Sequence, residues 1–200
     1  NNDMKLLAVA TVRFSGRKHD WNVRLKELSV SNEAMERTAK QLTQLKVVIP
    51  EQVMKLKSVA ASGMAYGQGE NVNARMNVRT ALGDLSVKAE KTGNKIKAGI
   101  TIPDFRIGEI LGEEKLNRLS ADITATGILG NGKLSRLDVK GNVNRIDYNG
   151  YSFKNIALNG RYAVNTAVAQ IAVNDQNCSI TVDGQVRNIN TTPETSLTAT

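Results

Sequence analysis

The stretch LSVKAEKTGNKIKAGITI at residues 85–102 decides the predicted fold. Apolar and polar side chains alternate on both sides of a central Thr-Gly-Asn turn, with Leu85 and Val87 before it and Ile96 and Ile100 after it. A period of two places every second side chain on the same face of a β-strand. Two such runs joined by a tight Gly/Asn turn are typical of a β-hairpin with one apolar face.

The same alternation continues outward from this hairpin in both directions. Upstream it covers residues 72–78, and downstream it covers successive runs as far as residue 187. Turn signals separate these runs, notably Gly-Asn-Gly at 130–132 and Asn-Gly at 149–150. Glycines recur on the apolar faces of the later runs, which suits a sheet that curls. We therefore predict a mainly β fold, an extended and curled antiparallel meander that is either groove-like or sandwich-like.

Helices are expected in two places. In the region 1–58, strands precede an amphipathic helix at about 33–46 and a short helix at about 50–57, because apolar residues recur there at helical spacing and Pro50 suits a first helical turn. In the β-repeat region 59–200, a short helical insert is expected at about 105–116. This division into 1–58 and 59–200 is the predicted domain organisation.

Composition excludes several classes of function. The 200 residues carry 27 Lys and Arg against 19 Asp and Glu, a net charge of +8, but the basic residues are scattered and lack interleaved aromatics, so no nucleic-acid partner is expected. A single Cys excludes an internal disulfide framework, and a single His gives little basis for metal or triad chemistry. His19 lies in a polar turn and is expected to be solvated, while Cys178 is expected to be a small buried hydrophobe. We predict no enzyme, no metal, no cofactor and no catalytic residue.

The positive signal is a single aliphatic face repeated on strand after strand. One interpretation is that these faces pack on each other as the core of a β-sandwich or barrel. The other is that a long sheet bends into a trough whose apolar side holds acyl chains. The pattern alone leaves both open. The hypothetical lining residues are Leu85, Val87, Ile96, Ile100, Ile102, Ile123, Leu137, Val139, Val143, Ile156, Leu158, Ile171, Val173, Ile180 and Val182.

Three segments carry a resemblance to a known family. They are VRTALGDLSV at 78–87, IPDFRIGEILG at 102–112 and IDYNGYSFKNI at 146–156, the last of which leads into LNG at 158–160. These segments resemble recurring strand and turn elements of TamB-type, AsmA-like translocation and assembly module proteins, and look most like the Bacteroidetes versions. The similarity covers roughly residues 56–190.

The resemblance implies a function and a location. Proteins of this family are very long, are anchored in the inner membrane by an N-terminal helix and span the periplasm. They are thought to act in outer-membrane biogenesis, carrying phospholipid along an apolar β-groove and working with an outer-membrane assembly barrel protein. The family has no catalytic residues to carry over to this sequence.

The ends of the sequence suggest an internal fragment of such a protein. We find no signal peptide and no apolar run near the ~20 residues that a membrane span needs, so the inner-membrane anchor is expected outside this segment. The leading expectation is a segment of a periplasmic, lipid-conducting envelope protein. The alternative is a structural or adhesion β-sandwich module of a cell-envelope protein without lipid transport.

Overall fold

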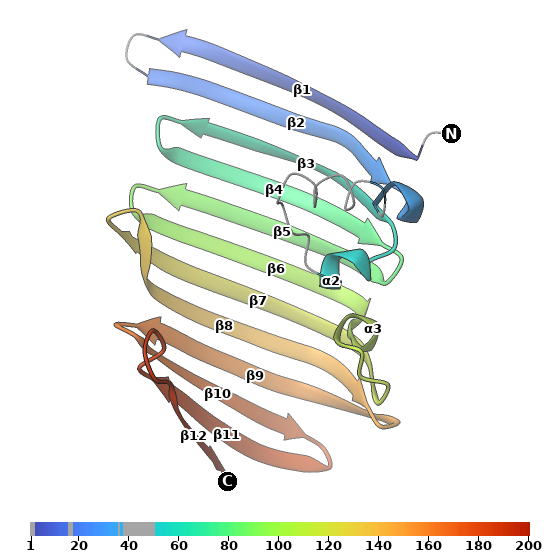
Figure 1. Ribbon diagram of the computed structural model, residues 1–200, viewed down its shortest axis with the longest axis vertical. Helices are drawn as coiled ribbons and strands as arrows, with labels where there is room; N and C mark the ends of the chain where they lie inside the picture. The colour runs from blue at the N-terminus through green and yellow to red at the C-terminus, as the bar shows by residue number, and fades with distance from the viewer. Residues whose placement is uncertain (1–2, 16–17, 36, 38–50) are drawn as a thin grey trace.

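The computed structural model describes residues 3–15, 18–35, 37 and 51–200, and it forms one antiparallel sheet of 12 strands (Figure 1). The strands are ordered in the sheet as they are in the chain, so each one pairs with its sequence neighbours. The predicted mainly β meander is therefore confirmed. The strands are β1 (Met4–Ser15), β2 (Lys18–Val30), β3 (Val59–Gln68), β4 (Asn71–Thr80), β5 (Gly83–Thr92), β6 (Lys95–Arg106), β7 (Leu116–Gly130), β8 (Lys133–Tyr148), β9 (Tyr151–Ala163), β10 (Thr166–Asp175), β11 (Cys178–Arg187) and β12 (Glu194–Ala199).

Tight turns explain why neighbouring strands pair. Asn149 and Gly150 have φ values of 49° and 82°, and Asn131 and Gly132 have values of 51° and 74°. Positive φ at both central residues is what a type I′ hairpin turn requires, and Asn and Gly adopt it at the lowest steric cost. These turns reverse the chain directly after β7 and after β8, so that β7, β8 and β9 lie side by side.

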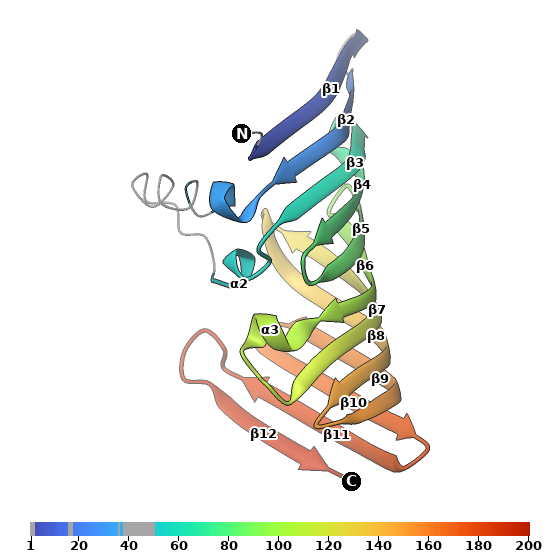
Figure 2. The same cartoon turned by 90° about the vertical axis from the view of Figure 1, so that its right-hand side faces the viewer.

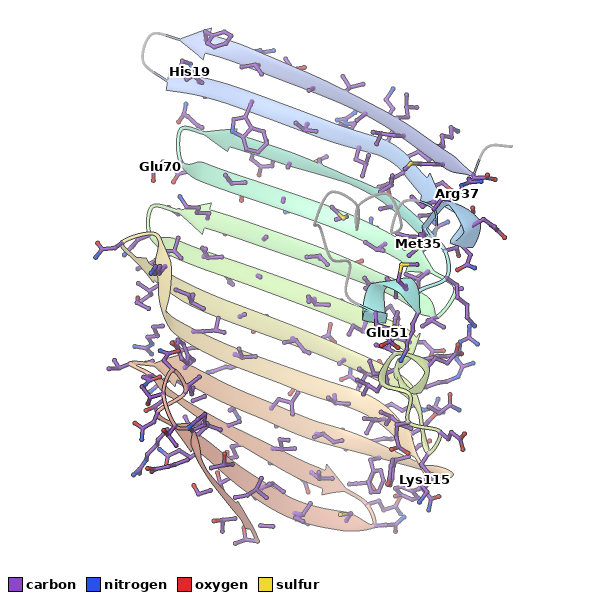
Figure 3. The ribbon with its side chains drawn as sticks, in the orientation of Figure 1. His19, Met35, Arg37, Glu51, Glu70 and Lys115 are labelled. Carbon is purple, nitrogen blue, oxygen red and sulfur yellow. The ribbon has the colours of Figure 1, made fainter. Side chains whose placement is uncertain are left out.

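The sheet is twisted and curled rather than flat. Viewed along its edge, the short helices α2 (Glu51–Met54) and α3 (Ile107–Leu111) lie on one side, and β11 and β12 bend toward that same side (Figure 2). We call the side of the sheet that carries the helices the inner face and the opposite side the outer face. In Figure 3 the inner face is turned to the viewer, and the side chains over the middle of the strands are almost all carbon.

The buried core is small and lies on the inner face of β7, β8 and β9. Its centre is Ala121, Val143 and Ile156, which are 0%, 7% and 8% exposed. Around them pack partly buried hydrophobic side chains, namely Leu119, Ile123, Ile146, Phe153, Leu158 and Val173. All described strands belong to this one sheet, so the predicted sandwich-like alternative, with two packed layers, is not what the described residues form.

The predicted N-terminal helices are not borne out. Residues 32–35 are helical, but most of the expected helix at 33–46 lies outside the described residues. The helix expected at 50–57 is only α2, four residues long. It stops because Lys57 has a φ of 64°, which breaks the helical path, and β3 begins at Val59. The sheet itself continues across the boundary predicted at residue 58, because β2 pairs directly with β3.

The predicted helical insert exists but is shorter than expected. The helix α3 covers Ile107–Leu111, whereas residues 105 and 106 still belong to β6 and Leu116 already belongs to β7. Phe105 stays in the strand because its side chain is 5% exposed and it pairs with Leu119. Gly112 ends the helix with a φ of 71°, the left-handed conformation that commonly terminates helices.

Candidate apolar binding face

Strand register brings the predicted lining residues onto the inner face. Val87 pairs with Ile100, and Ile100 with Ile123. Across the later strands, Leu158 pairs with Ile171, and Ile171 with Val182. Gly141 of β8 links the two runs, because it pairs with both Ile123 and Leu158. Residues that face each other across strands share one side of the sheet. Their side chains therefore form one apolar surface across β5 to β11.

This surface divides into a covered end and an open middle. Near α3, Val143 and Ile156 are buried, as are Phe105 and Ala121. Toward the middle of the strands, large apolar side chains remain open to solvent: Met76 is 44% exposed, Ile100 39% and Ile171 41%. A contiguous apolar surface left exposed on a protein commonly marks a binding site.

A row of mostly small side chains crosses the inner face at right angles to the strands, and we call this row the furrow. Ala98 pairs with Ala89, which pairs with Ala74, in one direction across the sheet. In the other direction Ala98 pairs with Ala125, which pairs with Val139. From β1 to β11 the row spans about 48 Å at the usual strand spacing of ~4.8 Å. Its members are Ala10, Val23, Ala65, Ala74, Ala89, Ala98, Ala125, Val139, Gly160, Ala169 and Gly184.

Bulkier side chains border this furrow on both sides. On the side nearer the core the border includes Met76, Val87, Ile100 and Ile171. On the other side it includes, among others, Trp21, Val72, Ile96, Leu137 and Tyr162. That border also carries one charge, Lys91, whose Nζ lies 3.5 Å from a carboxylate oxygen of Glu70 and 3.1 Å from its carbonyl oxygen. The furrow is therefore apolar, and most of its larger neighbours are apolar too, although Gly141 interrupts one border and Gly67 and Gly127 interrupt the other.

The inner face extends beyond the residues predicted from the sequence. Leu6 of β1 pairs in register with Leu28 of β2, Leu28 with Ala61 of β3, and Ala61 with Val78 of β4. Near the covered end, Phe105, Leu119, Ile146 and Phe153 also belong to it. The alternation of apolar residues at 72–78 could have placed β4 on this face from the sequence. Phe105 was missed because a helix, not a strand, was expected at its position.

The outer face is polar and is held together by side-chain pairs between strands. Asp138 accepts hydrogen bonds from Arg136 Nε and Arg161 Nε, each at 2.7 Å. These two guanidinium hydrogen bonds lower the pKa of Asp138 to about 2. Elsewhere on this face Asp122 accepts from Thr101 at 2.8 Å and from Asn144 at 3.1 Å. Each strand thus contributes aliphatic side chains inward and paired polar side chains outward.

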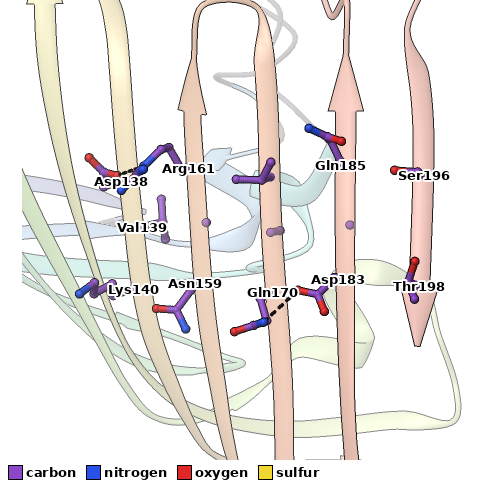
Figure 4. A pocket seen from close by; sticks show the side chains of 14 residues that line it. Asp138, Val139, Lys140, Asn159, Arg161, Gln170, Asp183, Gln185, Ser196 and Thr198 are labelled. Atoms are coloured by element: carbon purple, nitrogen blue, oxygen red, sulfur yellow. Dashed lines mark hydrogen bonds and ion pairs between the residues drawn. The ribbon is translucent and has the colours of Figure 1, made fainter. Parts of the chain in front are cut away.

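A hollow of about 530 Å³ lies on the outer face of β8 to β12 (Figure 4). Its charged groups are largely paired already: Arg161 donates to Asp138, and Gln170 donates to Asp183 at 2.9 Å. Lys140 lies at its edge (Figure 4). Most of the residues that line the hollow are polar, and they offer both hydrogen-bond donors and acceptors.

The two residues singled out individually in the sequence, His19 and Cys178, lie far apart in the sheet, in β2 and β11. His19 belongs to β2, and its ring stacks edge-on against Phe14 with a centroid distance of 5.1 Å, so it lies in a strand and not in a loop. Cys178 is a half-buried free thiol at the start of β11. Within the described part of the chain, no three His, Cys, Asp or Glu side chains are grouped so that they could hold a metal ion. None of the helices described there has the length and apolarity to cross a membrane.

Comparison with known proteins adds no relative: no family model, no curated protein and no solved structure matches the chain. The geometry of the inner face is therefore the basis on which function is proposed.

Proposed function

We propose that the inner face binds the acyl chains of phospholipid and that the chain is a lipid-carrying segment of an envelope protein that acts in outer-membrane biogenesis. The observation that carries this proposal is the continuous apolar inner face of a single open sheet, on which large side chains such as Met76, Ile100 and Ile171 remain exposed. A sandwich core buries such side chains, whereas a lipid-binding surface must keep them accessible.

The chemistry of the face fits flexible hydrocarbon. Its side chains are mainly Ala, Val, Leu and Ile, which offer contact area without hydrogen-bond donors or acceptors. Each methylene that leaves water contributes about 0.8 kcal/mol, so an acyl chain of ordinary length gains substantially from lying against the face. No fixed polar site is needed for the chain itself.

The furrow gives such a chain a path. Small side chains at Ala98, Ala125 and Gly160 leave room between taller neighbours, and the row continues from strand to strand along the long axis of the sheet. An acyl chain in the furrow lies across the strands and contacts the larger side chains on both sides. When the acyl chain moves along the furrow, it loses apolar contacts with one strand and gains equivalent apolar contacts with the next.

The wider setting follows from the resemblance to TamB-type proteins. We propose that the segment lies in the periplasm, that the whole protein is anchored in the inner membrane outside this segment, and that other regions work with an outer-membrane assembly barrel protein. The paired polar outer face suits an aqueous compartment, because its acids and bases satisfy one another while remaining in contact with water.

Binding of a phospholipid with a fluorescent acyl chain tests the proposal. We expect saturable binding to the purified chain, and the double variant Ile100→Ser/Ile171→Ser should weaken it by about tenfold or more, since it removes apolar contacts from the inner face.

The matched control is Met64→Ser/Val168→Ser. Met64 is 39% exposed and Val168 is 41% exposed, the same fractions as Ile100 and Ile171, but both lie on the outer face. The control should bind like the wild type. Equal weakening by both double variants, or no saturable binding by the wild type, contradicts the proposal.

A further inference from the structure

The outer face holds two like charges directly opposite each other. Arg75 of β4 pairs in register with Lys88 of β5. Side chains opposite each other on antiparallel strands have Cβ atoms about 4.5–5.5 Å apart, and like charges at that separation destabilise a sheet. The next positions in the same row are Gly99 of β6, Thr124 of β7 and Lys140 of β8.

The nearest carboxylates, Asp122 and Glu90, lie beside this pair and not between its members. Among the residues that the structure describes, neither Arg75 nor Lys88 forms an ion pair. Asp122 accepts from Thr101 and Asn144, as above. Glu90, two residues along β5 from Lys88, accepts from the Thr92 hydroxyl at 3.4 Å. Two cations therefore meet on the sheet without a carboxylate between them.

The surface beside the pair is hollowed. Hollows of about 470 and 280 Å³ share Arg75, Lys88, Gly99 and Thr124 in their lining. Asp122 also lines the larger one, and Lys97 and Glu90, which pair in register, line the smaller one. A larger residue would fit at position 99 without a clash, because a Cβ at Gly99 would lie no closer than 3.8 Å to any other atom. The missing side chain leaves open space between Lys88 and Thr124.

We propose that this hollow is a binding site for a phosphate-class oxyanion. Arg75 offers the planar fork of donors that suits phosphate, and Lys88 offers a point charge. The Thr124 hydroxyl donates to the Lys140 carbonyl oxygen at 3.4 Å and adds no donor to the site. A bound anion would also relieve the repulsion between the two cations. The site lies on the face opposite the proposed lipid surface and does not depend on it.

Titration of the purified chain with inorganic pyrophosphate, followed by NMR at the amides of Gly99 and Thr124, tests the site. We expect saturable shifts. The double variant Arg75→Gln/Lys88→Gln should weaken binding by about tenfold or more. Gly99→Val should also weaken pyrophosphate binding without any change in charge, because the methyl groups of the valine would occupy the hollow.

The control Lys26→Gln/Lys133→Gln removes the same charge from exposed lysines elsewhere and should leave binding within about twofold of the wild type. Equal weakening by both double variants would mean that net charge alone attracts the anion, and it would overturn the proposal. Shifts that do not saturate would overturn it too.

Two further experiments test whether this site is independent of the proposed lipid surface and whether its phosphate belongs to a lipid headgroup or to a soluble compound. Ile171→Ser, which lies on the inner face of β10 and outside both hollows, should bind pyrophosphate like the wild type, so failure of one proposal does not imply failure of the other. Phosphatidylcholine vesicles with and without phosphatidylglycerol then distinguish the sources. Greater binding to the anionic vesicles, lost in Arg75→Gln/Lys88→Gln, supports the site with a lipid headgroup as ligand. Pyrophosphate binding without that difference supports it with a soluble phosphate compound.

Discussion

Two glycines of the sheet serve different purposes. A Cβ at Gly63 would lie 2.3 Å from the carbonyl oxygen of Arg75, so β3 and β4 approach there more closely than any side chain allows. At Gly99 the nearest atom would be 3.8 Å away. Gly63 is therefore needed for the close packing of β3 against β4, whereas Gly99 only leaves a hollow on the surface.

Alanine substitutions separate these roles. Gly63→Ala should lower the free energy of unfolding by about 1–3 kcal/mol, because β4 must move away. Gly99→Ala should raise it by about 0.5–1 kcal/mol, because alanine loses less backbone freedom on folding. Urea unfolding measures both. Equal effects at the two sites would contradict the close approach of β3 and β4.

Asp138 gives a prediction at acidic pH. Its pKa is lowered to about 2 by the hydrogen bonds from Arg136 and Arg161. A carboxylate whose pKa is lower in the folded chain than in the unfolded chain stabilises the fold above its ordinary pKa of about 4, and that contribution is lost as the pH falls through about 2. The stability gap between the wild type and Asp138→Asn should therefore narrow between about pH 4 and 2.

Carboxyl-carbon NMR titration of Asp138 measures this pKa directly. Arg161→Gln removes one of the two donors and should raise the pKa toward its ordinary value. A pKa near the ordinary value in the wild type, or one that Arg161→Gln leaves unchanged, would show that the two arginines do not act on Asp138.

At the scale of elements, the inner face changes character along its strands. Ile156 of β9 is 8% exposed and packs in the core, whereas Ile171 of β10 is 41% exposed. Ile156→Ala should cost about 2–4 kcal/mol of stability, and Ile171→Ala about 1 kcal/mol or less, since a large part of the surface of Ile171 already contacts water. Thermal and urea unfolding check the difference. A similar large cost at both positions would mean that the open part of the inner face is covered.

The hairpins could be predicted from the sequence because local rules determine them. Alternation fixes which side chains share a face, and Asn149-Gly150 fixes where the chain turns. The exact register could not be predicted, because register shifts at bulges interrupt it, for example between Ile102 and Phe105 in the pairing of β6 with β7. A slip of one residue would have moved the whole apolar set to the other face.

The helices were the weaker part of the sequence prediction. Helical propensity is a weak prior that tertiary context overrides, and Phe105 shows this: it remains in β6 because its side chain is needed in the core. The furrow was also missed, since alanines and glycines from β1 to β11 become a row only once the register is known. Arg75 and Lys88 likewise lie opposite each other only because of the register in which β4 pairs with β5, which the sequence does not give.

At the scale of the whole molecule, the described sheet is asymmetric. It has 12 strands in one layer, an apolar inner face that is partly exposed and a polar outer face. The net charge of +8 and the polar outer face favour solubility, while the exposed inner face favours contact with apolar ligands. The central claim is that lipid occupies the inner face and not the outer one.

Site-specific photo-crosslinking in cells that produce the whole protein tests this claim most directly. A photoreactive residue is placed at Val139, in the furrow of the inner face, and separately at Lys140, the next residue on the outer face. Mass spectrometry then identifies what is attached. We expect phospholipid at Val139 and none at Lys140. Lipid at neither position in a folded protein, or equal labelling at both, would contradict it.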